Sequence, residues 1–206
     1  WLISNQFAKF AAVTFSKLLT TFSLGSSATS TKWGIPTTNA NTMLIGGGYG
    51  SAPLFALAEL LKNRGCRVDM VLGASTANKI YAPLEGKRSV SSLTLTTDDG
   101  TAGIHGQISE AIPRLIREFG TEVIYSCGPM GMLSAIAKIA DEFDLAHQCA
   151  VEEAMACGIG VCMTCVLPVE DEDGTVSMLR SCIDGPVMDG ANVRWDLVGK
   201  VPEGSA

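Results

Sequence analysis

The amino-acid sequence predicts an α/β protein with a five-stranded parallel sheet, followed by a small, cysteine-rich β domain. Three observations lead to this prediction. Short apolar runs alternate with amphipathic helical segments from residue 43 to residue 151. Glycine is dense between the first of these runs and the first helix. Four of the seven cysteines fall between positions 157 and 182, where the alternation has stopped.

Composition narrows the class of protein. Of the 206 residues, 47% are hydrophobic and 17% are charged, which suits a sizeable buried core. The net charge of −6 offers no broad basic surface to nucleic acid or anionic lipid. No run reaches the about 18 apolar residues of a membrane span. Clustered cysteines, odd in number, favour metal ligands in a reducing compartment, so we expect a cytoplasmic protein.

Residues 1–42 differ from the rest of the chain. They contain no acidic residue, and Ser or Thr fill 11 of the 23 positions from Thr20 to Thr42. An apolar stripe at helical spacing precedes this stretch, formed by Ile3, Phe7, Ala11, Phe15 and Leu18. A packed helix and a targeting segment are both open interpretations, and we assign neither. Because the first residue is Trp, we expect a fragment or a processed form.

Five apolar runs are expected to form the strands of the sheet. They are Met43–Gly47, Arg67–Gly73, Leu93–Thr97, Glu122–Cys127 and His147–Val151. Helices are expected between them, over the segment with Leu54, Ala58 and Leu61 on one face, near Ser75–Ala82, over Ile108–Phe119 and over Met130–Glu142. Strands separated by helices predict a parallel sheet covered on both faces. Pro113 is expected to mark the start of its helix or a kink.

The alternation breaks after Glu153. Two short β runs follow, Thr164–Val169 and Val176–Arg180, and an acidic turn that ends in Gly174 joins them as a hairpin. We therefore expect the sheet domain to cover residues 43–152 and the small domain to cover residues 153–206.

The turn after the first strand suits a bound phosphate. Its residues of interest are Gly46, Gly47, Gly48, Gly50, Ser51 and Pro53. Glycine lets backbone N–H groups approach a pyrophosphate closely, and the helix N-terminus adds partial positive charge. Proline suits the first helical turn. The fingerprint G-x-G-x-x-G is not met, so a tight turn without a ligand stays open as the alternative.

A second turn strengthens the prediction of a Rossmann-like nucleotide site. Gly128 and Pro129 follow the fourth strand, and ligands of open α/β sheets bind beyond the carboxyl ends of the strands. Cys127 at that strand end is, by itself, more often a buried apolar residue than a reactive thiol. After the second strand Lys79 is the nearest cation, so we expect NAD rather than NADP. We expect His105 and His147 to be structural.

The cysteines carry the most specific signal. Cys157, Cys162 and Cys165 have the spacing C-x4-C-x2-C, and Cys182 follows after sixteen residues. This spacing is typical of the plant-type [2Fe–2S] cluster, in which four thiolates hold two irons. Gly158 lets the loop wrap closely around such a cluster. A structural zinc site and unligated thiols are the alternatives.

Together these segments resemble the electron-transfer subunit of the NAD-dependent dihydroorotate dehydrogenase of type B, an enzyme of pyrimidine synthesis. The resemblance runs from about residue 43 to residue 199. It is carried by Leu44–Pro53, Thr97–Gly100, Cys127–Pro129 with Met132, Met155–Cys162 and Cys182–Val187.

The resemblance implies a ferredoxin-reductase-like fold with an FAD-binding barrel, an NAD domain and a [2Fe–2S] domain. It further implies that electrons pass between NAD(H), FAD, the cluster and the FMN of a separate catalytic subunit that oxidises dihydroorotate, with net flow toward NAD in turnover. A hetero-oligomer follows from this. Cys127 is then expected to act catalytically near the nicotinamide, with Gly128 beside it, and Asp99 is expected among the cofactor-binding residues.

The chain departs from the family at its start. The FAD barrel of the family precedes the glycine turn and is much longer than the roughly forty residues found here. Either the chain is truncated or FAD binding has been lost. Two other functions stay open, the reductase component of an oxygenase system and a non-catalytic nucleotide-binding module with a structural zinc site.

Overall fold

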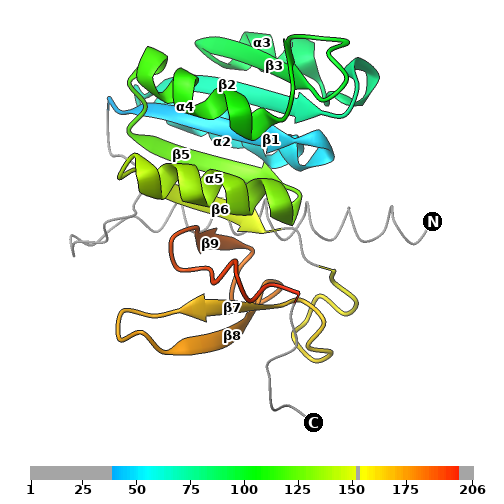
Figure 1. Ribbon diagram of the computed structural model, residues 1–206, viewed down its shortest axis with the longest axis vertical. Helices are drawn as coiled ribbons and strands as arrows, with labels where there is room; N and C mark the ends of the chain where they lie inside the picture. Colours follow the sequence, from blue (N-terminus) through cyan, green and yellow to red (C-terminus); the bar gives the residue numbers. More distant parts are fainter. Residues whose placement is uncertain (1–38, 152–153, 200–206) are drawn as a thin grey trace.

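The computed structural model describes residues 39–151 and 154–199, which form a seven-stranded sheet between two layers of helices and a separate two-stranded sheet (Figure 1). The strand order of the large sheet is β4-β3-β2-β1-β5-β6-β9. Its strands are β1 (Asn41–Gly47), β2 (Arg67–Ala74), β3 (Ser92–Thr97), β4 (Ile104–His105), β5 (Val123–Gly128), β6 (Ala146–Val151) and β9 (Val187–Asp189). All pair in parallel except β9, which is antiparallel to β6.

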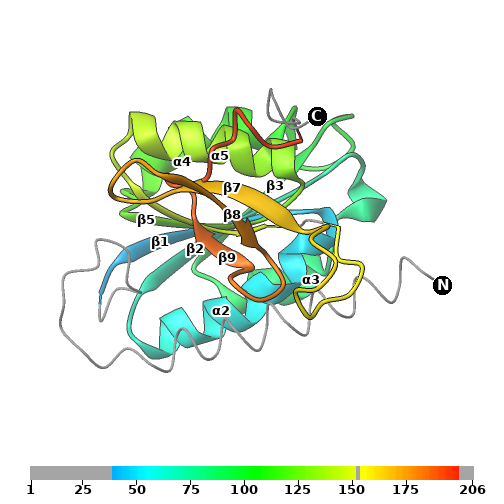
Figure 2. The ribbon, with the colours of Figure 1, turned by 90° about the horizontal axis from the view of Figure 1, so that it is seen from below.

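Within the described residues, helices cover both faces of the large sheet (Figure 2). Helices α2 (Ala52–Asn63) and α3 (Pro83–Ser89) lie on one face, and α4 (Ile108–Phe119) and α5 (Met130–Glu142) lie on the other. The central strands are therefore buried on both sides, which explains why they are continuous apolar runs rather than alternating ones. The two helix pairs belong to separate apolar clusters on opposite sides of the sheet.

The five predicted strands are confirmed, and the sheet has two more. Strands β4 and β9 contain two and three residues, too few to show a period in the sequence. The helix expected near Ser75–Ala82 is wrong: Ala77–Lys79 is a single 3₁₀ turn, and α3 begins at Pro83, a residue that suits the first helical position. Pro113 does not start its helix, because α4 begins at Ile108.

The order in which strands are added to the sheet reverses at β1. Strands β2, β3 and β4 follow on one side of β1, whereas β5 and β6 lie on the other. The chain therefore continues from β1 and β5 into helices on opposite faces of the sheet, α2 and α5, and such a switch point forms the crevice in which α/β sheets bind ligands.

The small domain is attached to the edge of the large sheet. Strands β7 (Val166–Glu170) and β8 (Val176–Arg180) form the predicted antiparallel hairpin, while β9 adds to β6. An apolar cluster joins α5 and β6 to this domain, and its buried members are Leu133, Cys149, Val151, Leu167, Met188 and Val193. The predicted boundary at residue 153 stays a prediction, and β9 extends across it.

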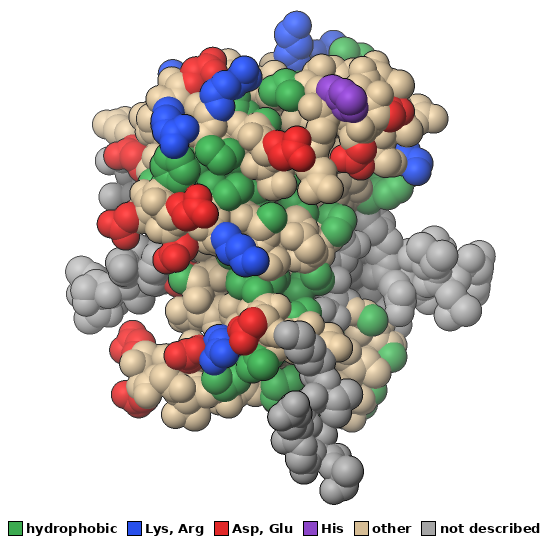
Figure 3. All heavy atoms as spheres, viewed as in Figure 1, with side chains coloured by type: hydrophobic (Ala, Val, Ile, Leu, Met, Phe, Trp, Pro, Cys, Tyr) green, Lys and Arg blue, Asp and Glu red, His purple; other side chains and the backbone are tan. Residues whose placement is uncertain are grey.

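The surface agrees with the charge pattern of the sequence. Charges of both signs are interspersed over the face in Figure 3, and acidic side chains gather at the tip of the β7–β8 hairpin. No helix among residues 39–151 and 154–199 has the length and apolarity to cross a bilayer. The apolar stripe predicted between Ile3 and Leu18 lies outside the described residues.

Candidate functional site

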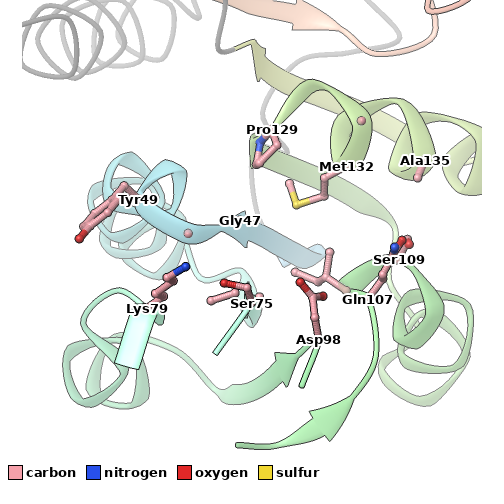
Figure 4. A pocket seen from close by; sticks show the side chains of 15 residues that line it. Gly47, Tyr49, Ser75, Lys79, Asp98, Gln107, Ser109, Pro129, Met132 and Ala135 are labelled. Carbon is pink, nitrogen blue, oxygen red and sulfur yellow. The ribbon is translucent and has the colours of Figure 1, made fainter. Parts of the chain in front are cut away.

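A cavity of about 510 Å³ opens at the carboxyl ends of β1, β2, β3 and β5 (Figure 4). Its wall comes from the turns after these strands and from the first turns of α4 and α5. The lining residues are Gly47, Gly48, Tyr49, Gly73, Ala74, Ser75, Lys79, Asp98, Gln107, Ile108, Ser109, Pro129, Gly131, Met132 and Ala135. The cavity thus lies at the switch point of the sheet, where the topology places a ligand site.

Some residues of the glycine turn line the cavity, and others hold the turn in place without reaching the cavity. Gly47 and Gly48 line the cavity, and Gly48 has a left-handed φ of 55°. The Ser51 hydroxyl donates a hydrogen bond of 2.8 Å to the Gly48 carbonyl and closes the turn from behind. Gly46, also buried, and Pro53 in the first turn of α2 complete this support. Only part of the predicted nucleotide turn therefore faces the cavity.

The β1 and β5 turns pack backbone against backbone. A Cβ atom on Gly50 would lie 2.7 Å from the Gly128 Cα atom, so this position has no room for a side chain. Pro129 lines the cavity, whereas Cys127 has no exposed surface and belongs to an apolar cluster with Leu44. The catalytic role expected for Cys127 stays a prediction.

Asp98 and Asp99 have different surroundings. The Asp99 carboxylate accepts hydrogen bonds from the backbone N–H of Thr101 (3.0 Å) and from its hydroxyl (2.6 Å), and these bonds lower the pKa of Asp99. Asp98 lines the cavity and Asp99 does not. The role expected for Asp99 in cofactor binding stays a prediction.

Four polar residues of the cavity wall belong to none of the predicted site residues, namely Ser75, Asp98, Gln107 and Ser109. These four residues have similar positions in the chain: each lies just after a strand or at the start of a helix that follows a strand. That signal could have found them, because ligand sites in open sheets collect at such positions.

Each of the four predicted cysteine ligands has a cysteine neighbour that affects its ionisation or is affected by it. The thiol of Cys162 lowers the pKa of Cys157, and burial, followed by the thiol of Cys165, raises the pKa of Cys182. Cys157 and Cys162 form an outer pair toward solvent, whereas Cys165 and Cys182 form an inner pair in the apolar cluster that also holds Cys127. In the described part of the chain, no three His, Cys, Asp or Glu side chains converge on one metal position.

This pairing fits a two-iron cluster. Each iron of a [2Fe–2S] centre takes two protein ligands, whereas a zinc ion needs four donors around one point. The loop also directs backbone N–H groups at its sulfurs: the N–H of Ile159 donates to Cys157 Sγ at 3.4 Å. That bond, followed by the thiol of Cys162, lowers the pKa of Cys157 to about 6, which favours the thiolate that binds iron.

The loop backbone is shaped and held by neighbouring residues. Gly158 and Gly160 have left-handed φ angles of 72° and 80°, and Met163 shares this conformation with a φ of 56°. Arg180 donates a 3.3 Å hydrogen bond to the Gly160 carbonyl, and the Ser181 hydroxyl donates one of 2.6 Å to the Cys165 carbonyl. The segment before Cys182 therefore fixes the loop that carries the other three cysteines.

The expected structural role of His147 agrees with its surroundings. Its side chain is 1% exposed, and its Nε2 atom lies 2.7 Å from the Ser126 hydroxyl. Burial lowers the pKa of His147 to about 4. His105 is exposed on β4, and it does not line the cavity.

Comparison with known proteins finds a matching domain family and several similar proteins. Residues 152–194 match the iron–sulfur cluster binding domain of dihydroorotate dehydrogenase B. The chain is similar to the electron transfer subunits of dihydroorotate dehydrogenase B (NAD(+)) of Streptococcus pneumoniae, at 39% identity over 145 residues, and of Desulforamulus reducens, at 31% over 162 residues. These matches cover 70% and 79% of the chain, and they span only 56% and 62% of the two relatives.

A solved structure shares the fold. It is that of an NADH-dependent reduced ferredoxin-NADP oxidoreductase, studied for flavin-based electron bifurcation. The identity is 32% and the TM-score is 0.65, over 77% of this chain and 56% of that chain. The similarity supports the expected ferredoxin-reductase-like fold.

Proposed function

We propose that this chain, which belongs to the family of the electron-transfer subunits of dihydroorotate dehydrogenase B, transfers electrons between NAD(H) and a [2Fe–2S] cluster. Its residues 152–194 match the iron–sulfur cluster binding domain of that enzyme. The electrons pass through a flavin and serve a catalytic subunit that oxidises dihydroorotate in pyrimidine synthesis. One observation carries the proposal: the segment at Cys182 is hydrogen-bonded through Ser181 to Cys165 of the loop, so that four cysteines with plant-type spacing come together as the donor set of a two-iron cluster.

The two sites lie at the same end of the sheet. The nucleotide cavity opens at the carboxyl ends of the strands, and the cysteine loop begins after the carboxyl end of β6 (Figure 1). Cys165 and Cys182 belong to the apolar cluster that also contains Leu44 of β1 and Cys127 of β5. A continuous packed core therefore connects the cysteine loop with the strands that carry the nucleotide turns.

In this proposal the residues of the chain bind the dinucleotide and hold the cluster. Gly47 and Gly48 present backbone at the cavity wall for the pyrophosphate, with the N-terminus of α2 behind them. The N–H groups aimed at the cysteine sulfurs stabilise negative charge there and raise the reduction potential of a bound cluster. A flavin supplies the conversion of a hydride into single electrons. FAD enters the proposal from the family, because we assign no FAD site to the described residues.

The solvent side of the cysteine loop suits a protein partner. Ile159, Val161 and Met163 are 70%, 73% and 51% exposed, and they surround the outer cysteine pair. Large apolar side chains grouped on a surface mark interaction sites. We place the FMN-containing catalytic subunit there, in a cytoplasmic hetero-oligomer.

The first test is metal analysis of the anaerobically purified chain. We expect two irons and two acid-labile sulfides per chain, with the visible absorption of a [2Fe–2S] centre. Cys162→Ser removes an exposed ligand and is expected to abolish this absorption. Cys66→Ala, which alters a buried cysteine outside the loop, is the matched control and keeps the cluster. One zinc per chain with no visible absorption contradicts the proposal.

A second candidate function is supported by the solved structure, because its identity of 32% falls within the 31–39% of the two dehydrogenase relatives. On that basis the chain would serve an oxidoreductase that exchanges electrons between NAD(P)H and ferredoxin. The partner distinguishes the two functions. Co-purification with a flavoprotein that oxidises dihydroorotate supports the first, whereas cluster reduction by reduced ferredoxin with no response to dihydroorotate supports the second.

A further inference from the structure

In the described part of the chain, strand β8 has a neighbouring strand on one side only. It pairs with β7 and forms the outer strand of the hairpin, farther from the large sheet than β7 (Figure 1). The other side of β7 is occupied, because the N–H of Glu170 donates a 2.8 Å hydrogen bond to the Asn192 carbonyl. The N–H of Arg194 likewise donates one of 2.9 Å to the Pro168 carbonyl. The hairpin therefore presents one edge to solvent, that of β8.

The register of the hairpin shows which backbone groups of β8 point outward. In an antiparallel pair of strands, hydrogen-bonded and non-hydrogen-bonded residue pairs alternate. The N–H of Asp171 donates a 3.0 Å hydrogen bond to the Thr175 carbonyl, and the strands keep this register to the end of β8. Ser177 therefore turns its backbone groups toward β7, whereas Val176 and Met178 turn theirs away from it.

This edge is closed at one end and open beside it. The outward N–H of Arg180 donates a 2.8 Å hydrogen bond to the Asp184 carboxylate, and the Arg180 carbonyl accepts one of 2.8 Å from the Asp184 N–H. Among the described residues, no hydrogen bond reaches the outward N–H and C=O groups of Val176 and Met178. Their side chains are 39% and 50% exposed. Such an edge is a template for another strand.

The sequence of this edge is complementary to itself. When two copies of β8 run antiparallel around a two-fold axis at Ser177, Val176 of each copy lies opposite Met178 of the other. Both are hydrogen-bonded pairs, in which the two residues exchange both N–H to C=O bonds, so every outward group of Val176 and Met178 is satisfied. The two apolar side chains of each pair also cover each other on one face of the joined sheet.

The charges of the hairpin favour the same arrangement. The exposed acidic tip Asp171–Asp173 precedes β8, and Arg180, whose side chain is 35% exposed, lies at the other end of the strand. Antiparallel pairing brings the acidic tip of each copy toward Arg180 of the other. It also keeps the two acidic tips at opposite ends of the joined sheet, where they do not repel each other.

We propose that β8 is the interface of a symmetric dimer of this chain, in which two hairpins join into one antiparallel sheet. The contact is short, so the dimer is weak and its population rises with the concentration of the chain. This proposal concerns assembly, and it does not depend on the proposed electron transfer.

The first test places a thiol on the two-fold axis. Ser177 and its copy form a non-hydrogen-bonded pair with Cα atoms about 4.5 Å apart, which a disulfide can bridge. In oxidised glutathione, Ser177→Cys is expected to form disulfide-linked dimers about tenfold faster than the native chain, as measured by non-reducing electrophoresis. Glu172→Cys, at the exposed hairpin tip, is the matched control and is expected to react at the native rate.

The second test removes a hydrogen-bond donor from the edge. Met178→Pro deletes the outward N–H and no bond to β7, since proline is tolerated on an edge strand where the N–H faces solvent. We expect the dissociation constant of the dimer to rise about tenfold or more, measured by sedimentation velocity over a series of concentrations. Met178→Leu keeps the N–H and an apolar side chain, and it is expected to preserve the dimer. Thermal unfolding verifies that each variant is folded.

Two results would overturn the proposal. One is that Ser177→Cys forms linked dimers no faster than Glu172→Cys, which would mean that the copies do not pair at β8. The other is that Met178→Pro leaves the concentration dependence of sedimentation unchanged, which would place any contact between copies elsewhere. Neither result bears on the cluster, which metal analysis tests separately.

Discussion

His147 is a titratable side chain with almost no access to water. It pairs with the Ser126 hydroxyl on β5, and a Cβ atom on Gly190 would overlap its ring. The Gly190 N–H also donates a 2.8 Å hydrogen bond to the His147 carbonyl. His147 therefore lies where the residues after β9 meet the large sheet, and a charge placed on it would be buried in that contact.

Acid is expected to weaken the fold through this residue. The pKa of His147 is about 4 in the folded chain and near 6.5 when unfolded, so the unfolded chain binds more protons between these values. The contribution of neutral His147 to the free energy of unfolding is fully present above pH 6.5. It falls by roughly 3 kcal/mol as the pH drops to about 4. Urea unfolding between pH 7 and pH 4 measures this loss.

Two variants identify the source of the pH dependence. His147→Gln, which does not titrate, is expected to flatten the dependence between pH 6.5 and pH 4 even if it lowers stability overall. His105→Gln changes an exposed histidine and is expected to leave the dependence as it is. An unchanged slope in His147→Gln would show that other groups cause the acid response.

At the scale of elements, the contact between the β1 and β5 turns is a steric constraint on the site. Gly50→Ala places a methyl group 2.7 Å from Gly128 Cα, and the two turns must separate to admit it. We expect a loss of about 1–3 kcal/mol in the free energy of unfolding and a weaker affinity for NADH. Thermal unfolding and NADH titration measure the two effects.

Gly86→Ala on α3 is the matched control for this substitution. The nearest atoms to its new Cβ atom would be methyl groups of Leu72 and Leu93, at 3.5–3.6 Å, which is ordinary contact. Alanine also favours a helix over glycine by about 0.8–1.0 kcal/mol, so this variant is expected to be as stable as the native chain or more stable. If both variants melt alike, the backbone contact at Gly50 has no special role.

The elements that could be predicted from the sequence are those whose signal is local. Helix α5 was predicted with its observed bounds, because its apolar positions repeat at helical spacing and proline precedes it. Strands β4 and β9 are defined by partners far away in the sequence, so no local pattern reveals them. Helix α4 continues through Pro113 because the buried face around Ile112 and Leu115 outweighs one missing hydrogen bond.

The candidate site divides in the same way. Glycine turns and cysteine spacing are sequence patterns: part of the glycine turn lines the cavity and the four cysteines are free thiols, while their roles as ligands stay predictions. The choice between Asp98 and Asp99 depends on which carboxylate Thr101 binds, which is a property of the folded turn. The pairing of the four thiols likewise needs the β7–β8 hairpin to bring Cys182 back to Cys165.

At the scale of the whole molecule, the two domains share a core. Leu167 of β7 is fully buried against Leu133 of α5 and Val151 of β6. We expect Leu167→Ala to lower the free energy of unfolding by about 2–5 kcal/mol and to shift one calorimetric transition that includes both domains. Leu84→Ala, at a leucine that is 70% exposed, is the control and is expected to have almost no effect. Two separate transitions would contradict a shared core.

Strand β9 also covers a sheet edge. Its residues Val187–Asp189 occupy the hydrogen-bonding groups of Gln148–Ala150 on β6, which would otherwise face outward as an open template for foreign strands. Cys182 precedes β9 by only a few residues, so damage that loosens the cysteine loop also loosens this cover. If the proposed cluster is held there, a chain that loses it to oxygen becomes prone to aggregation, and insolubility is then the first sign of the loss.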